Sequence, residues 1–323
     1  MSLIETIYST FGPFGQWLIR RRRARLNAPK PETFVQHVVA WIRTLVWAVS
    51  VVTIINGLAL ASFTVPTGSM ERTVMAGDFL FVNKFIYGPS TPQIIPFLNL
   101  PLPFYKLPPL SAPKHGDVIV FIFPGNRDDA TADHFEYYLK RCIAVAGDTL
   151  EIRGGRVIVN GVERPLPEHG QFAPYSREER MARHEYDRMA TFPQGRLFTR
   201  DDYGPIRIPK EGDVIALTPE SVYEWATFIR REGHTVNLGT GTIDGQPAPS
   251  YTVERDYVFG MGDNRDNSAD SRFWGFIPQD DVVGTPMVVY WSWEPDNMES
   301  GKRLSLFERF GTIRWNRLGT VIH

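Results

Sequence analysis

An apolar run from Thr44 to Phe63 constrains the fold of this chain more than any other feature, because none of its residues is charged. The run is about 20 residues long, which is the length that a helix needs to cross a hydrocarbon core of about 30 Å. A buried helix of a soluble protein is the alternative, but few such helices are apolar on every face over this length. We therefore predict a transmembrane helix over residues 44–63.

Basic residues on one side of this run predict its orientation. Residues 20–25 contain five arginines, whereas the net charge of the whole chain is only -1. Basic segments beside a membrane helix stay in the cytoplasm, so residues 1–43 are predicted to be a cytoplasmic or membrane-surface segment. The chain after Phe63 would then lie on the outer face. The low net charge also argues against nucleic acid as a partner.

Residues 4–19 are apolar too, but Glu5, Gly12, Pro13 and Gly15 interrupt them. A membrane span of this kind would be short and broken. We expect the segment to lie on the membrane surface, and a second span is the alternative.

Beyond the predicted membrane helix, the sequence is typical of a mostly β protein. Short apolar runs that end at Gly, Pro or Asn predict strands at 79–82, 118–123 and 257–259. Residues 157–162 contain Asn-Gly, which suits a two-residue hairpin turn. One helix is predicted away from the membrane, at 219–232, because Thr218 can cap it, Pro219 suits its first position and Gly233 follows its end.

The composition predicts that one part of this β protein is an insertion. Residues 151–254 are more polar and more highly charged than the sequence on either side of them. The predicted fold class is therefore mainly β, with an N-terminal transmembrane helix as anchor. We expect one β domain in two parts, 64–150 and 255–323, the second including a C-terminal tail. An inserted α+β subdomain at 151–254 would separate these parts.

The segment 94–110 is rich in proline and yet strongly apolar, whereas loops are usually polar. Two interpretations remain open. The segment folds over the core, or it forms an exposed apolar surface that touches the bilayer beside the anchor.

The sequence lacks the common motifs for metal or phosphate chemistry. It has no HExxH, no CxxC, no Gly-Lys-Ser phosphate loop and no GxSxG. The run Asp263–Asp270 lacks the sixth-position Gly and the twelfth-position Glu of a calcium loop, so we expect neither a metal nor a cofactor. Cys142 is the only cysteine, which excludes an intrachain disulfide. Its apolar neighbours predict a core residue rather than a nucleophile.

Three segments have residue types that suit acyl-transfer chemistry. Residues 66–70, Pro-Thr-Gly-Ser-Met, can place the hydroxyl of Ser69 on a sharp turn. Residues 138–148 place Lys140 in an apolar strand. Such a lysine usually reaches solvent by its long stem. If its amine is buried instead, its pKa falls and it becomes a competent general base. Residues 262–275 are a dense polar loop beside strand signals.

Together these segments closely resemble the signature boxes of type I signal peptidases, also called leader peptidases. The family's serine box matches residues 68–70, and a second box matches residues 77–88. Its lysine box matches residues 138–148, and its last box matches residues 262–275 almost letter for letter. One departure is Ala146, where many members have Pro, which should adjust a turn without touching the base.

The resemblance implies a serine–lysine mechanism. Ser69 would be the nucleophile, and neutral Lys140 would remove its proton. The backbone amide of Ser69 and the hydroxyl of Thr67, a position where many relatives have Ser, would form the oxyanion hole. Ser268 would hydrogen-bond the lysine amine and orient it.

The resemblance also implies roles for the residues around this pair. Asp270 and Arg272 would hold the last loop by ion pairing. Met70, Tyr138 and Leu139 would help to form a substrate cleft for small residues at the first and third positions before the cut, as in A-x-A sites. The two parts of the β domain would form the catalytic domain, and the insertion would be non-catalytic.

The expected partners are therefore signal-peptide-bearing preproteins and the lipid bilayer. The expected location is a bacterial inner membrane, with the catalytic domain on the periplasmic face. A self-cleaving serine–lysine repressor is one alternative, but it would be soluble and would carry a DNA-binding helix pair. A membrane-tethered β binding module without activity is another, but it would be expected to lack Ser69 or Lys140.

Overall fold

The computed structural model describes residues 15–17, 19–20, 33–58, 60–89, 94–95, 100–101, 105–295 and 305–323. The chain divides into two compact units, Met1–Thr53 and Ile54–His323. Most of residues 4–19, which were predicted to lie on the membrane surface, are outside the described residues.

One long helix, α3 (Phe34–Leu58), contains most of the predicted membrane helix. Its part from Phe34 to Thr53 is long and apolar enough to cross a membrane. The helix begins ten residues before the predicted start at Thr44, because residues 34–43 are mostly apolar and a single Arg43 does not interrupt a helix. It also ends earlier than Phe63, since Leu60–Thr64 pairs with a neighbouring strand.

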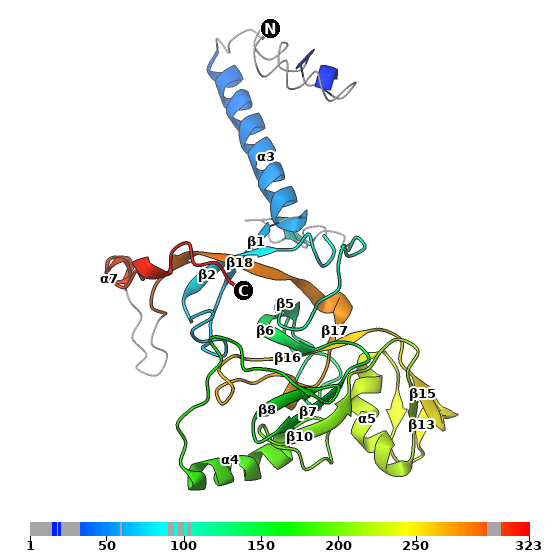
Figure 1. Ribbon diagram of the computed structural model, residues 1–323. Coiled ribbons are helices and arrows are strands. Elements are labelled where there is room, and N and C mark those ends of the chain that lie inside the picture. Colours follow the sequence, from blue (N-terminus) through cyan, green and yellow to red (C-terminus); the bar gives the residue numbers. More distant parts are fainter. Residues whose placement is uncertain are drawn as a thin grey trace. The chain divides into compact units, whose positions relative to one another are not determined.

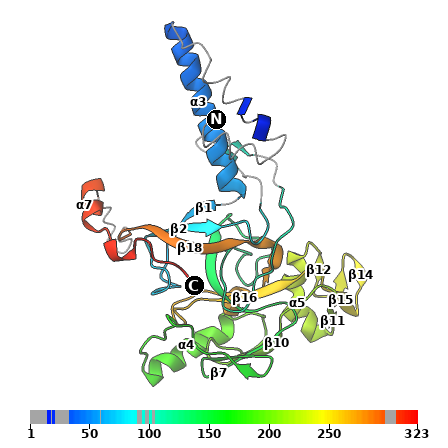
Figure 2. The same ribbon diagram turned by 45° about the horizontal axis from the view of Figure 1, so that its top comes forward.

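An antiparallel sheet of seven strands forms the centre of the second unit (Figures 1 and 2). The strand order is β1-β2-β18-β5-β6-β16-β17. The strands are β1 (Leu60–Thr64), β2 (Asp78–Asn83), β5 (Val118–Ile122), β6 (Tyr137–Ala144), β16 (Tyr257–Met261), β17 (Ile277–Pro278) and β18 (Val282–Ser292). β18 pairs with both β2 and β5, and so joins the N-terminal and central strands. The three predicted strands are confirmed as β2, β5 and β16.

Burial on both faces of the sheet explains why the strand β5 is apolar throughout. Val118 and Val120 pack in one buried cluster, whereas Ile119 and Phe121 pack in another. Successive side chains of a strand point to opposite faces, so both faces of the sheet are covered here. Cys142 lies in the second cluster and is fully buried, which confirms the prediction that it is a core residue. Burial also raises the pKa of its thiol, and keeps it protonated.

Residues 151–254, which were predicted to be an insertion, contain both helices and strands. A four-stranded sheet has the order β10-β7-β8-β9. Its strands are β7 (Thr149–Arg153), β8 (Arg156–Val159), β9 (Val162–Glu163) and β10 (Tyr203–Arg207). The predicted hairpin is confirmed between β8 and β9, and both turn residues, Asn160 and Gly161, have the positive φ that this turn needs.

The predicted helix at 219–232 is confirmed as α5 (Pro219–Arg231), with Thr218 as its N-cap. A second helix, α4 (Arg177–Ala190), was not predicted. Five short strands complete the region: β11 (Val214–Ala216), β12 (Val236–Asn237), β13 (Thr242–Ile243), β14 (Gln246–Pro247) and β15 (Ser250–Thr252). A single buried cluster includes Ala144 and Phe259 of the main sheet together with Val157 and Phe228 of the insertion. The insertion therefore shares its core with the main sheet.

Short elements connect these strands and end the chain. They are β3 (Ile94–Ile95), β4 (Leu100–Pro101), α6 (Ser271–Trp274), η1 (Gln279–Asp281), α7 (Leu306–Gly311) and η2 (Trp315–Arg317). In the apolar segment 94–110, β3 pairs with β4, and Leu107 and Leu110 are exposed. Its contact with a bilayer stays a prediction.

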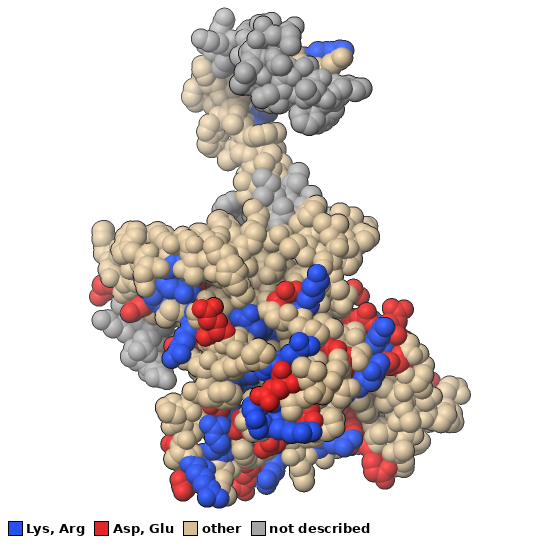
Figure 3. All heavy atoms as spheres, viewed as in Figure 1, with Lys and Arg blue, Asp and Glu red and all other residues tan. Residues whose placement is uncertain are grey.

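Charge is unevenly distributed over the second unit. On the face shown in Figure 3, charged side chains gather over the insertion, whereas the part formed by β1, β2 and β18 carries few. Aromatic side chains are frequent there. Phe81 stacks on Tyr290 with ring centroids 4.2 Å apart, and it is partly exposed. Trp315, near the end of the chain, is also exposed.

Candidate active site

The predicted nucleophile, Ser69, lies on a tight turn between β1 and β2. The turn is closed by a hydrogen bond from the Glu71 amide to the Gly68 carbonyl, 3.0 Å long. The next side chain, Met70, is buried in the core and anchors the turn. Ser69 itself stays half-buried, so its hydroxyl can meet a substrate while its backbone is held in place.

Lys140 reaches this hydroxyl from the strand β6. Its side chain is 4% exposed, and its Nζ donates to Ser69 Oγ at 2.8 Å and to the Leu139 carbonyl at 3.2 Å. Burial lowers the pKa of the amine to about 8, although the negative charge of Asp270 raises it and the positive charge of Arg272 lowers it further. About one amine in ten is then neutral at pH 7, against fewer than one in a thousand for an ordinary lysine.

The polar loop 262–275 lies against both groups. The Arg272 guanidinium donates to both carboxylate oxygens of Asp270 at 2.8 Å, and both side chains are buried. Burial by itself would raise the pKa of the Asp270 carboxyl, but the charge and hydrogen bonds of Arg272 outweigh it and keep that pKa low. The backbone amide of Asn264 donates to the Ser69 carbonyl at 3.0 Å, which connects this loop to the turn that carries Ser69, the predicted nucleophile turn.

Ser268 is buried in the same loop. Its hydroxyl has no hydrogen-bond partner among the described residues. The predicted hydrogen bond to the Lys140 amine is therefore not among the contacts of this structure, and the orienting role of Ser268 stays a prediction. A buried hydroxyl without a partner is unusual, because it loses its hydrogen bonds to water.

Gly262 is a site residue that the sequence analysis did not single out. A Cβ at this position would lie 2.3 Å from Ser268 Oγ and 2.5 Å from the Ser69 carbonyl oxygen. Both distances are too short for any side chain. Glycine therefore allows the nucleophile turn and the Ser268 segment to approach each other. The only signal in the sequence was its place at the start of the last box.

Two hydrogen-bond donors beside the Ser69 hydroxyl have no partner within the described residues. Across the part of the chain that the structure describes, neither the Ser69 backbone amide nor the Thr67 hydroxyl has a hydrogen-bond partner. Thr67 is exposed, and both residues line one cavity. Donors with these properties suit an oxygen that gains negative charge during acyl transfer.

That cavity has a volume of about 1090 Å³ and contains the Ser69–Lys140 pair. It has room for several residues of an extended peptide. All three predicted cleft residues line it, together with apolar and polar neighbours: Met70, Tyr138 and Leu139, then Phe63, Val65, Leu80, Val120 and Tyr137, and also Asn126, Arg127, Asp128, Tyr186, Arg200 and Asp266. Within the described residues, no group of three His, Cys, Asp or Glu side chains could hold a metal ion.

Known proteins resemble this chain over most of its length. A signal peptidase I from Helicobacter pylori is 28% identical over 297 residues, which cover 88% of this chain and 93% of that protein. One from Aquifex aeolicus is 30% identical over 247 residues, covering 72% of this chain and 75% of that protein. One from Pseudomonas aeruginosa is 25% identical over 328 residues, covering 97% of this chain and 93% of that protein.

Residues 38–291 match the protein family described as "Signal peptidase, peptidase S26". The match includes the nucleophile turn, the lysine strand and the polar loop, as well as the whole insertion. This chain therefore belongs to the signal peptidase family of serine endopeptidases, peptidase S26.

Proposed function

We propose that this protein removes N-terminal signal peptides from exported preproteins, and that Ser69 and Lys140 carry out the cleavage. The observation that carries the proposal is the buried contact of 2.8 Å between Lys140 Nζ and Ser69 Oγ. An amine of lowered pKa in contact with a hydroxyl that lines a peptide-sized cavity supports the proposal.

The reaction begins with a proton transfer. Neutral Lys140 takes the proton of the Ser69 hydroxyl as Oγ attacks the carbonyl carbon of the scissile bond. The carbonyl oxygen becomes negative and accepts hydrogen bonds from the Ser69 amide and the Thr67 hydroxyl. The Lys140 ammonium then gives its proton to the leaving amine, which departs with the mature protein.

The second half of the reaction releases the signal peptide. Lys140 is neutral again, and it takes a proton from a water molecule that attacks the ester on Ser69. The second tetrahedral intermediate collapses, and Lys140 returns the proton to Ser69 Oγ. Each step needs the same amine to be neutral first and charged next, which a pKa near the working pH allows.

Specificity for small residues rests on the family resemblance and on the chemistry of the cavity. The nucleophile turn is flanked by apolar side chains, including Met70 and Leu139. An apolar pocket that fits Ala excludes larger side chains by overlap, so the proposed cleavage sites are of the A-x-A type.

The proposed location is a bacterial inner membrane. The helix α3 would anchor the protein, and the arginine-rich segment before it would remain in the cytoplasm. The catalytic unit would then face the periplasm. The partly exposed aromatic side chains of β2 and β18, and exposed Trp315, suit the polar boundary of a bilayer.

The test is cleavage of a preprotein that bears an Ala-x-Ala site by the full chain in detergent. Ser69→Ala and Lys140→Ala are compared with the unaltered protein. We expect only the unaltered protein to cut, after the second Ala. Equal cleavage by all three would mean that another nucleophile acts, and no cleavage by any would favour a binding module.

A further inference from the structure

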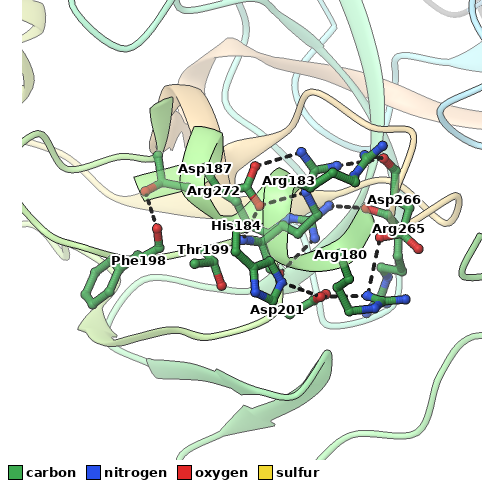
Figure 4. Close-up of polar contacts among 12 residues, drawn as sticks. Arg180, Arg183, His184, Asp187, Phe198, Thr199, Asp201, Arg265, Asp266 and Arg272 are labelled. Atoms are coloured by element: carbon green, nitrogen blue, oxygen red, sulfur yellow. Dashed lines mark hydrogen bonds and ion pairs between the residues drawn. The ribbon is translucent and has the colours of Figure 1, made fainter. Parts of the chain in front are cut away.

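The insertion lies against the polar loop that carries Ser268 and Asp270. Its contacts come from α4 and from the segments before and after this helix. Figure 4 shows residues of α4 and of the segment after it beside the loop. The face of α4 that meets the loop is charged, with Arg180, Arg183, His184 and Asp187 at positions i, i+3, i+4 and i+7. The capping box of Ser176 and Glu179 fixes the start of the helix.

The first connection is a strand-like bridge before α4. The Gln171 amide donates to the Asp263 carbonyl at 2.9 Å, and the Arg265 amide donates to the Gln171 carbonyl at 2.9 Å. Asn264, between these two, donates to the Ser69 carbonyl on its other side. Hydrogen bonds therefore run without a gap from the insertion, through the loop, to the nucleophile turn.

The second connection converges on the backbone carbonyl of Asp266. Arg183 Nη2 donates to this oxygen at 2.5 Å, and Arg200 Nη1 donates to it at 2.7 Å. The Asp266 carboxylate accepts the Ala173 amide at 2.7 Å. Hydrogen bonds from charged donors are stronger than neutral ones, so the two arginines hold the Asp266 carbonyl firmly. The Ala173 amide holds the side chain of the same residue.

The third connection links two buried ion pairs. Arg200 makes a bidentate contact with fully buried Asp187, at 2.8 and 2.7 Å. The Arg200 carbonyl also accepts a hydrogen bond from Arg272 Nη1 at 3.1 Å. The pair Asp187–Arg200 of the insertion thus supports the pair Asp270–Arg272 of the loop.

The place of Asp266 gives these contacts a consequence for the dyad. Asp266 and Ser268 line the same cavity as Ser69 and Lys140. Ser268 follows Asp266 by two residues and lies tightly against Gly262. Asp270, whose negative charge acts on the Lys140 amine, follows Asp266 by four residues in the same loop. A shift of the Asp266 peptide would therefore change the surroundings of the amine.

We propose that segment 171–200 of the insertion is a positioning element for the Ser69–Lys140 pair, and that Arg183 and Arg200 are its positioning residues. Both act by fixing the Asp266 carbonyl. The inference rests on the proposed function, since its effect is on the rate of preprotein cleavage. It gives the insertion a role in the reaction, although none of its side chains touches the reacting atoms.

Arg183→Gln is the sharpest test, because Arg183 does not line the cavity whereas Arg200 does. In the full chain in detergent, we expect kcat to fall roughly tenfold, as for the loss of one charged hydrogen bond, with KM changed by less than about twofold. The rise of kcat/KM with pH should also move to higher pH, since a looser loop admits water to Lys140. Rates are divided by the fraction of folded protein.

Arg153→Gln is the matched control, because it breaks an exposed bidentate Arg–Glu pair elsewhere in the insertion. It should leave kcat and the pH profile unchanged. Arg183→Lys, which keeps a charged donor, should recover part of the lost rate. Unchanged kcat and pH profile in Arg183→Gln would overturn the inference. If the unaltered protein does not cleave preprotein, the proposed function fails instead.

Should Arg183→Gln fail to fold, the conservative Arg200→Lys is measured in the same way. Lysine keeps the charge but has no planar fork to reach Asp187 and the Asp266 carbonyl together. We expect a lower kcat and a shifted pH profile, and a pH profile identical to that of the unaltered protein would contradict the inference.

Discussion

The insertion and the active site both bury cations, but they surround them differently. In the insertion, buried Arg200 is bidentate to Asp187, at 2.8 and 2.7 Å. In the active site, Lys140 is just as buried, yet among the described residues its Nζ contacts only the Ser69 hydroxyl and a carbonyl. Buried cations with a carboxylate partner serve the structure. Lys140, which has no carboxylate in contact, has a lowered pKa, and its amine can be neutral near pH 8.

Lys140 and Arg141, which are adjacent on β6, show the same contrast between a cation without a carboxylate partner and a cation with one. Arg141 donates to both carboxylate oxygens of buried Asp263, at 2.8 and 2.7 Å. Lys140 points to the opposite face of the strand, where Ser69 lies. The strand therefore presents an ion-paired arginine on one side and the Lys140 amine on the other.

Lys140→Arg should have the largest effect, because it gives the active site a cation that cannot lose its proton in this pH range. We expect kcat to fall by about 10⁴-fold or more, as when a member of a catalytic triad is removed. Initial cleavage rates from pH 7 to 9 measure this. Lys114→Arg, at an exposed lysine, is the control and should cleave normally. Substantial cleavage by Lys140→Arg would remove the lysine from the role of base.

Thr67→Val tests the oxyanion hole, because it keeps the shape of the side chain and removes the hydroxyl. We expect kcat to fall by about 10²- to 10³-fold with little change in KM, since the donor acts on charge that develops in the transition state. Thr67→Ser keeps the hydroxyl and should stay within a few-fold of the unaltered rate. Equal rates for Val and Thr at this position would exclude the hydroxyl from the oxyanion hole.

Arg141→Met tests the structural side of the comparison, because it leaves Asp263 buried without its partner. Breaking a buried pair in this way costs about 3–5 kcal/mol of unfolding free energy. Urea unfolding followed by tryptophan fluorescence measures it. Asp263→Asn in the same chain should restore part of the loss. Unchanged stability of Arg141→Met would mean that the pair does not matter to the fold.

Much of the fold could be predicted because short strands and turns have local signals. The Asn160-Gly161 turn and the Thr218-Pro219 start of α5 are examples, and both are confirmed. The ends of α3 were predicted less well, because an apolar run does not show where a helix begins or ends. The apolar residues Leu60–Thr64 form a strand instead, since they pair with β2. The helix α4 was missed because its buried face is charged rather than apolar.

The sequence motifs predicted individual residues of the candidate site, but not the contacts between them. Ser69 and Lys140 are 71 positions apart in the sequence, and only the resemblance brought them together before the structure gave their contact. The clearance at Gly262 and the two arginines on the Asp266 carbonyl depend on distant segments, which no local pattern encodes. Only the structure could therefore identify the residues that position other side chains.

The most direct test of this account is the pKa of the Lys140 amine in the folded protein. It can be measured by NMR on protein with ¹³C-labelled lysine side chains, with Lys140→Arg to assign the signal. We expect titration at about 8, and a rise of kcat/KM with pH through the same range, because only the neutral amine accepts the serine proton. A Lys140 pKa at the ordinary lysine value of about 10.4 would contradict the account.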